Sequence, residues 1–167
     1  ASKKIKKYIC ININASELAL QRRWDPKNFK NLSILISQKF PDYHQLYVGG
    51  PNDKEYVNSS MKSIASDKII NVAGKFSILE TAFLFKKSRL LISNDSGPLH
   101  LSAAVNIPTI SFFGPETPRL YAPLNEKAIV FYKNLPCSPC INIRNAKKTH
   151  CSNTVCLNFT VNEIFSA

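Results

Sequence analysis

The sequence predicts an α/β fold, in which a parallel sheet carries helices on both faces. Apolar runs alternate with amphipathic stretches, the connections between them are short, and no internal repeat interrupts the alternation. Because parallel strands need a crossover connection, usually a helix, this alternation favours a parallel sheet. The 167 residues, of which 44% are hydrophobic, suffice for one compact domain or for one half of a two-domain enzyme.

The first three strands follow from short apolar runs separated by helix signals. Residues 7–13 (KYICINI) predict a buried strand, and Asp25 with Pro26 supplies an N-cap and a first-turn proline for a helix over 27–40. Two further strands are predicted at 44–50 and 68–74, and a helix is predicted between them at 53–65.

The second half of the chain continues the same alternation. Ser77 and Glu80 form a capping box, whose hydroxyl and carboxylate each accept a hydrogen bond from a free amide, so a helix runs from there to about Lys87. The remaining strands are predicted at 89–93, 108–114 and 127–132. A loop and a helix between the first two of these strands complete a Rossmann-like sheet.

Three parts are expected along the chain. They are a domain over 1–135, a cysteine-containing segment over 136–159 packed on the same domain, and the start of a C-terminal helix over 160–167. Thr160 and Glu163 form a capping box that begins this helix. The sequence stops barely one turn later and begins only a few residues before the first strand, so we expect both ends to be cut from a longer protein.

The chain is strongly basic, with 22 Lys and Arg against 11 Asp and Glu and a formal net charge of +11. Lysines at positions 3, 4, 6, 7, 147 and 148 contribute part of this excess. It favours a phosphate-bearing partner such as a phosphorylated substrate, an anionic membrane face or nucleic acid. No RNA-binding signature and no helix-turn-helix pattern is present, so we expect no nucleic-acid partner. No apolar run approaches the roughly 20 residues of a membrane span, so we expect a cytoplasmic protein.

Residues 93–105 (SNDSGPLHLSAAV) follow the fourth predicted strand, at the sheet edge where open parallel sheets bind ligands. Free amides at a helix start favour an anion, Ser96 adds a hydroxyl donor, and Gly97 lets a phosphate approach the backbone. His100 can donate from its imidazole, and Asp95, which a diphosphate would repel, can cap the loop or accept from a sugar hydroxyl. The alternative is an ordinary helix N-cap followed by a structural histidine. Neither a Walker lysine pattern nor a GxGxxG motif is present.

Residues 93–118 (SNDSGPLHLSAAVNIPTISFFGPETP) resemble the signature of glycosyltransferase family 9, the bacterial heptosyltransferases that build the lipopolysaccharide core. The resemblance covers nearly the whole chain, from Lys7 to Phe165. Other segments stand in the order of the family's C-terminal domain: NAS at 14–16, QRRW at 21–24, YVGGPND at 47–53 and VAGKFSILE at 72–80. The resemblance implies a two-domain GT-B architecture, of which this chain is the C-terminal half that binds an ADP-heptose donor.

The resemblance assigns the diphosphate and the nearby sugar to Asp95, Ser96, Gly97 and His100, with Asp95 and His100 as the catalytic candidates. It implies an inverting displacement at the anomeric carbon, in which His100, helix amides and cationic side chains stabilise the leaving nucleotide diphosphate. No metal is expected to be essential for this step. The acceptor would be lipopolysaccharide core or a similar glycan, and the enzyme would work at the cytoplasmic face of the inner membrane, with peripheral contact to it.

In the family the N-terminal domain supplies the acceptor site and an aspartate proposed as general base, so this chain alone should not transfer sugar. Further donor contacts are implied in the first loop and around the base. The family usually has lysine where Arg22 stands. The implied residues are Ser16 with Arg22 or Arg23 at the phosphate, Phe76 beside the adenine, and Asn52 or Asp53 at the ribose or base. Alternatively, Phe76 is a core residue, Ser16 a turn residue, and the arginines are solvated.

Four of the five cysteines lie in the tail, at Cys137, Cys140, Cys151 and Cys156, and Cys10 in the first strand is expected to fill core space. Their spacing resembles two ligand pairs that close a tetrahedral thiolate site, so a structural zinc is predicted, with iron as the alternative metal. His150 could replace one ligand. Four reduced thiols, or disulfides formed by oxidation, are the other interpretations.

Two rival functions remain open at this stage. A non-catalytic module could retain the fold and the diphosphate site without transferring sugar. A basic nucleic-acid-binding protein with a zinc-like tail is supported by charge alone, and it would bind a long nucleic acid with a steep salt dependence.

Overall fold

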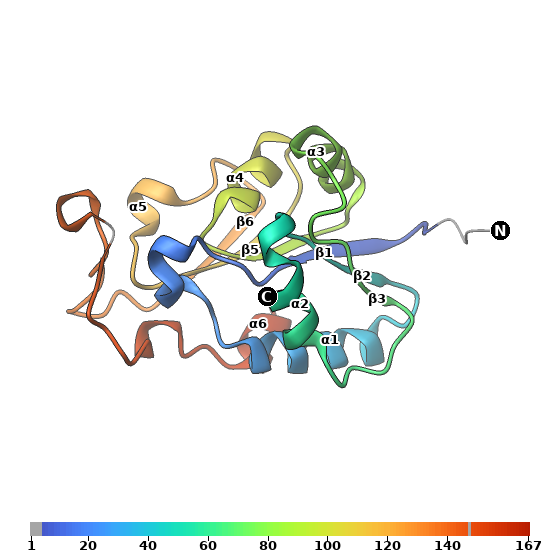
Figure 1. The fold of residues 1–167 in the computed structure, drawn as a ribbon, viewed down its shortest axis with the longest axis horizontal. Coiled ribbons are helices and arrows are strands. Elements are labelled where there is room, and N and C mark those ends of the chain that lie inside the picture. The colour runs from blue at the N-terminus through green and yellow to red at the C-terminus, as the bar shows by residue number, and fades with distance from the viewer. Residues whose placement is uncertain (1–4, 147) are drawn as a thin grey trace.

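The computed structural model describes residues 5–146 and 148–167, so the lysines at 3, 4 and 147 lie outside the described residues. These residues form a six-stranded, fully parallel sheet with the strand order β3-β2-β1-β4-β5-β6 (Figure 1). The strands are β1 Tyr8–Asn12, β2 His44–Tyr47, β3 Ile69–Asn71, β4 Leu91–Asn94, β5 Thr109–Phe113 and β6 Ala128–Tyr132. The predicted α/β class and all six predicted strands are confirmed.

The longer helices begin where their capping residues predict. Asp25 accepts a hydrogen bond from the Lys27 amide and starts α1, and the Ser77–Glu80 capping box starts α3. The helices are α1 Pro26–Lys39, α2 Lys54–Met61, α3 Ile78–Lys87, α4 Gly97–Ala104, α5 Pro118–Tyr121 and α6 Val161–Phe165. The helix predicted over 53–65 ends early, at Met61, and Ser63 just beyond it takes a left-handed φ of 73°.

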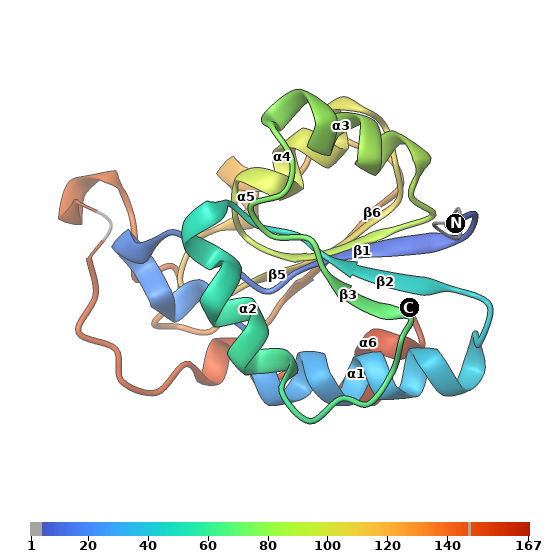
Figure 2. The same cartoon turned by 45° about the vertical axis from the view of Figure 1, so that its right-hand side comes forward.

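The pleat of β1 sorts its side chains between the two faces of the sheet. Ile9 and Ile11 belong to the core shared with α1 and α6, whereas Tyr8 and Cys10 pack with Phe85 of α3 on the other side. Figure 2 shows α1, α2 and α6 on one face and α3 and α4 on the other. The predicted covering of both faces by helices, and the core position of Cys10, are confirmed.

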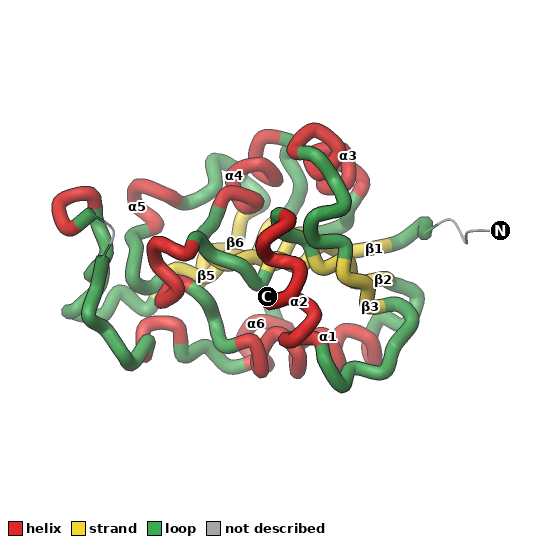
Figure 3. Tube along the Cα trace, in the orientation of Figure 1, coloured by secondary structure: helices red, strands yellow, loops and turns green. Residues whose placement is uncertain are grey.

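A buried aromatic cluster connects the first helix to the tail. Trp24 is fully buried, with its ring centroid 4.9 Å from that of Phe29 and 4.7 Å from that of Phe112. Its indole Nε1 donates to the backbone oxygen of Phe159 at 3.2 Å. Figure 3 shows the chain between β6 and α6 as loop with short helical turns, η3 Ile143–Asn145 and η4 Val155–Leu157. Burial of the Trp24 side chain therefore fixes the end of this segment against the domain.

The strand order creates a topological switch point between β1 and β4. The chain runs outward from β1 to β2 and β3, and then returns to pair β4 with β1, with Cys10 opposite Leu91 and Asn12 opposite Ser93. The connections that leave β1 and β4 diverge to opposite faces of the sheet, and this divergence opens a crevice at the carboxyl ends of the strands. These ends lie on the left in Figure 1.

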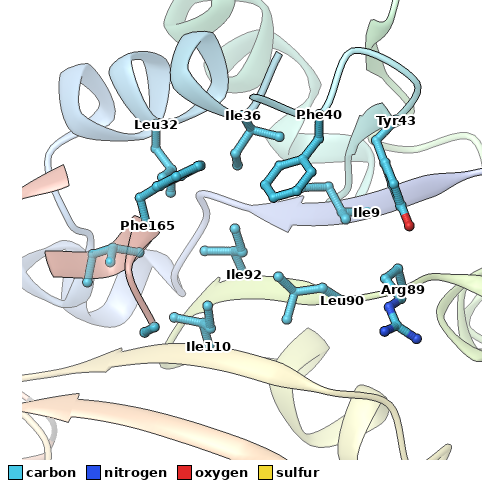
Figure 4. A pocket seen from close by; sticks show the side chains of 12 residues that line it. Ile9, Leu32, Ile36, Phe40, Tyr43, Arg89, Leu90, Ile92, Ile110 and Phe165 are labelled. Carbon is cyan, nitrogen blue, oxygen red and sulfur yellow. The ribbon is translucent and has the colours of Figure 1, made fainter. Parts of the chain in front are cut away.

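An apolar groove of about 360 Å³ lies elsewhere, between α1, α6 and the sheet (Figure 4). Leu32 and Ile36 of α1 face Ile92 and Ile110 across it. Its labelled polar side chains are Tyr43 and Arg89, at one end of the groove. This lining suits apolar packing better than a nucleotide.

None of the helices formed by residues 5–146 and 148–167 is both long enough and apolar enough to span a membrane.

Candidate functional site

Two adjoining cavities occupy the switch point. The larger has a volume of about 560 Å³ and is lined by Asn12, Asn14, Ala15, Ser16, Glu17, Gly50, Pro51, Asn52, Asp53, Ser96, Gly97 and Pro98. The smaller, of about 150 Å³, is lined by Ser16, Arg22, Asp95, Ser96, Gly97, His100, Glu116 and Tyr121. Ser16, Ser96 and Gly97 line both cavities, so the two meet in front of α4. The structure therefore brings the first loop and the 93–105 stretch together.

Two asparagines at the end of β1 connect three strand ends. Asn12 Nδ2 donates to Ser93 Oγ at 3.0 Å and to Ser96 Oγ at 2.7 Å. Asn14 Nδ2 donates to Asn12 Oδ1 at 3.1 Å and to the Val48 oxygen at 2.9 Å. This network fixes the loop after β4 relative to β1 and β2. Neither residue is among the candidates predicted from sequence, although polar side chains at the end of a buried strand were a signal that could have found them.

The start of α4 lies at the crevice, where Ser96, Gly97 and Pro98 line the larger cavity. In the described part of the chain the Ser96 side chain makes no capping bond to the amides of α4, because its hydroxyl accepts from Asn12 and donates to the Asn94 oxygen at 3.2 Å. A Cβ built on Gly97 would meet no described atom within 4 Å, so there is open space beside this backbone. A helix start without a side-chain cap favours an anion at this place, because the helix dipole is positive there.

Asp95 and Arg22 form an ion pair in the smaller cavity. Arg22 Nη1 donates to Asp95 Oδ2 at 3.3 Å, with 16% and 5% of the two side chains exposed. Burial raises the pKa of Asp95, and Glu116 adds to the rise, whereas Arg22 and His100 act in the opposite direction. The buried Nε of Arg22 has no hydrogen-bond partner among the described residues. The Nε–H of the Arg22 guanidinium is therefore available to donate a hydrogen bond in addition to the bond from Nη1 to Asp95.

Arg23, the neighbour of Arg22, is directed elsewhere. Its Nη2 donates to the Ala15 oxygen at 3.0 Å, and its guanidinium carbon lies 4.1 Å from the centroid of the Tyr56 ring. Arg23 is not among the residues that line either cavity. Of the two arginines proposed for phosphate contact, Arg22 is the one that the fold places at the smaller cavity.

The other candidate residues divide between the larger cavity and the surface. Ser16 Oγ accepts from the Leu18 amide at 3.3 Å and caps the short helix η1, Glu17–Arg22, while also facing both cavities. Asn52 and Asp53 line the larger cavity, where Asp53 Oδ2 accepts from the Gly50 amide at 2.8 Å. Phe76 is 42% exposed, precedes α3 and is not among the lining residues of either cavity.

Two further residues of the smaller cavity were absent from the sequence-based candidates. Glu116, which follows β5, is 2% exposed, and Tyr121 ends the short helix α5. Both lie in the stretch after the fifth strand, which ends at the same edge of the sheet as β4. That shared edge is the signal that could have found them.

The four tail cysteines remain a prediction as metal ligands. Residues 5–146 and 148–167 contain no group of three or more His, Cys, Asp or Glu side chains arranged to hold a metal ion. Burial is the main cause that raises the pKa of Cys156 to about 11, and Cys140, Cys151 and Cys137 add to the rise. The cysteine thiols influence one another, but their described arrangement is not a coordination shell.

The family of the chain follows from a comparison with protein-family models. Residues 1–150 match the model described as glycosyltransferase family 9 (heptosyltransferase). The chain belongs to glycosyltransferase family 9. This match confirms the resemblance that the 93–118 segment indicates.

Individual members of the family agree with this result. Lipopolysaccharide heptosyltransferase 1 of Campylobacter coli is 37% identical over 116 residues, which are 66% of this chain and 32% of that protein. Lipooligosaccharide heptosyltransferase 2 of a Campylobacter jejuni strain is 29% identical over 87% of this chain and 46% of that protein. The solved structure of E. coli ADP-heptose LPS heptosyltransferase II superimposes with a TM-score of 0.79 at 20% identity, covering 98% of this chain and 46% of that one.

The matches cover only part of each relative. The chain spans less than half the length of each of these relatives. The solved structure shares its fold, which confirms the prediction that the chain folds as one half of a GT-B glycosyltransferase.

Proposed function

We propose that this chain is the donor-binding domain of a glycosyltransferase that transfers heptose, or a related sugar, from an ADP-sugar to lipopolysaccharide core or a similar glycan. The observation that carries the proposal is the pair of cavities that meet in front of the uncapped start of α4. Family membership supports it, as do the matched relatives, which are lipopolysaccharide and lipooligosaccharide heptosyltransferases. ADP is the proposed nucleotide because the solved relative is an ADP-heptose enzyme.

The chemistry of the lining suggests how such a donor lies. The larger cavity has room for the nucleoside beside Asn52 and Asp53. The diphosphate belongs at the junction, where the Ser16 hydroxyl and the Gly97 amide at the start of α4 can donate hydrogen bonds. The glycosyl group then enters the smaller cavity, because the carboxylate of Asp95 repels phosphate but accepts hydrogen bonds from sugar hydroxyls.

The proposed reaction is a displacement at the anomeric carbon. An acceptor hydroxyl oxygen forms a bond to that carbon while the bond from the carbon to the phosphate oxygen breaks, and its electron pair leaves with ADP. Arg22, His100 and the α4 amides stabilise the charge that develops on the leaving diphosphate. The proton of the acceptor passes to a base outside this chain, in an N-terminal acceptor domain, so the chain alone binds the donor without transferring sugar.

The proposed setting is the cytoplasmic face of the inner membrane. The formal charge of +11 supports a peripheral contact there, because basic surfaces are attracted to anionic lipid headgroups.

A two-dimensional amide NMR titration of the chain with ADP, UDP and GDP tests the proposal. This method detects binding even near 1 mM, which corresponds to only about 4 kcal/mol. We expect ADP to shift the amides of Ser16, Ser96, Gly97 and His100, together with those of Asn52 and Asp53 in the larger cavity, more strongly than UDP or GDP. If none of the three nucleotides moves these amides at millimolar concentration, the chain does not hold a nucleotide diphosphate as proposed.

A further inference from the structure

The smaller cavity contains two buried carboxylates at the ends of neighbouring strands. Asp95 follows β4 and is 4% exposed, and Glu116 follows β5 and is 2% exposed. Because β4 and β5 pair in parallel, with Asn94 opposite Phe112, the two connections leave the sheet side by side. Both side chains line the smaller cavity, and the pKa of Asp95 is raised mainly by burial, with a smaller contribution from Glu116.

Two acidic side chains are a poor lining for a diphosphate. Among the residues that the structure describes, Arg22 and His100 are the basic groups that line this cavity, and Arg22 is bound to Asp95. A second phosphate or a carboxylate placed here would face both Asp95 and Glu116 at short range and in a water-poor setting, where like charges repel strongly. The cavity is therefore electrostatically matched to a neutral ligand.

A neutral ligand with several hydroxyl groups fits the same lining well. A carboxylate offers about four acceptor sites, so a carboxylate with a protein partner still accepts hydrogen bonds from sugar hydroxyls. Such bonds to a charged acceptor are stronger than those between neutral groups. Ser96 and Gly97, which the smaller cavity shares with the larger, place this polyol site directly beside the proposed diphosphate position.

We propose that Glu116 is a specificity-determining residue of the donor site, which together with Asp95 selects a neutral, hydroxyl-rich glycosyl group and rejects acidic ones. This inference rests on the proposed function, because it assumes that a nucleotide diphosphate occupies the junction. It assigns the hydrogen bonds of Glu116 to the glycosyl group alone, so replacing Glu116 must weaken binding of the sugar and must not weaken binding of the nucleotide.

Calorimetric titration of the chain with ADP and with ADP-heptose separates these two contributions. The ratio of the two dissociation constants measures the contribution of the sugar to the affinity, which we call the sugar contribution. In Glu116→Gln we expect the affinity for ADP-heptose to fall about tenfold, the scale of a lost hydrogen bond to a charged acceptor. The affinity for ADP should stay the same or rise, because a negative charge near the diphosphate is removed. Glu126→Gln, an equal charge change at an exposed residue that lines neither cavity, should leave both constants unchanged.

A second ligand pair tests the rejection of acidic sugars. ADP-glucose and ADP-glucuronic acid differ only in a terminal carboxylate, and the wild-type chain should bind the neutral one more tightly. In Glu116→Gln the difference in affinity between ADP-glucose and ADP-glucuronic acid should be smaller than in the wild type. A residue with a purely structural role would not change this preference.

The outcomes distinguish the inference from the function on which it rests. Failure of the wild-type chain to bind ADP overturns the proposed function, and with it this inference. If ADP binds but Glu116→Gln leaves both the sugar contribution and the preference for neutral sugar unchanged, only the role of Glu116 is wrong. If thermal unfolding shows that Glu116→Gln does not fold, Glu116→Asp keeps the charge and shortens the side chain, and it should reduce the sugar contribution without changing ADP binding.

Discussion

Asn94 holds the loop that carries Asp95, and its removal should destabilise the fold in a calculable way. Asn94 Oδ1 accepts from the Trp24 amide at 2.9 Å, and Nδ2 donates to the Ile13 oxygen at 2.8 Å. Asn94, Trp24 and Ile13 are all fully buried. In Asn94→Ala, therefore, two backbone groups lose their partner at places that water does not reach.

The expected cost follows from these two groups. Each buried donor or acceptor left without a partner costs about 1–3 kcal/mol, so Asn94→Ala should lower the free energy of unfolding by roughly 2–6 kcal/mol. This is a large part of the ~5–15 kcal/mol that stabilises a typical domain. Asn94→Asp keeps the acceptor for Trp24 but places a carboxylate oxygen against the Ile13 oxygen, so it too should be destabilising near neutral pH.

Urea unfolding followed by circular dichroism measures these changes. Asn162→Ala is the matched control, because Asn162 is exposed on α6, and its replacement should change the free energy of unfolding by less than about 0.5 kcal/mol. A loss in Asn94→Ala no greater than that of the control would refute the reasoning. Water or a shifted backbone would then satisfy the Trp24 amide and the Ile13 oxygen.

Three further predictions concern the site and the tail. Arg22→Gln should weaken ADP binding by about 1.5–3 kcal/mol, the scale of a hydrogen bond between charged groups, and more than Arg23→Gln does; equal losses in calorimetry would contradict the placement of Arg22 at the phosphate. Burial raises the pKa of Asp95 in the folded chain above 3.8, its value in the unfolded chain. The protonated side chain therefore stabilises the fold fully below pH 3.8, and this stabilisation is lost as the pH rises through the folded-state pKa. Asp95→Asn should therefore unfold in urea near neutral pH at no lower concentration than the wild type, whereas a less stable variant would show that the Arg22 pair outweighs burial. Finally, elemental analysis of reductively purified chain should find one zinc or iron ion, which a Cys137→Ser, Cys140→Ser double variant should lose, and wild-type chain without metal would remove the metal hypothesis.

Signals that act over a few residues allowed much of the fold to be predicted. Asp25, Ser77 and Thr160 mark helix starts because each side chain accepts a bond from an amide two or three residues later. The short helices α5 and η1 were missed, because four to six residues carry too little periodicity to be recognised.

The candidate site was predicted in part, and the reasons differ from residue to residue. Asp95 and His100 were found because they follow a recognisable strand, and both line the smaller cavity. Asn12 and Glu116 were missed because they belong to other strand ends: Asn12 is the last residue of β1, and Glu116, although it lies in the 93–118 segment, follows β5. Arg22 and Arg23 are chemically identical neighbours, and only the backbone path at the end of η1 directs one to Asp95 and the other to Tyr56.

The sequence by itself determined the α/β class, the strand and helix alternation, the family and the stretch from Ser93 to His100 as the centre of a site. The tertiary structure alone decided the strand order, and therefore that the ends of β1, β4 and β5 meet. The physical reason is range: capping and periodicity depend on residues within about four positions of each other, whereas strand order depends on burying side chains far apart in the chain. Glu116 reaches Asp95 only because β5 lies beside β4, and the polyol pocket that we propose exists only in the folded chain.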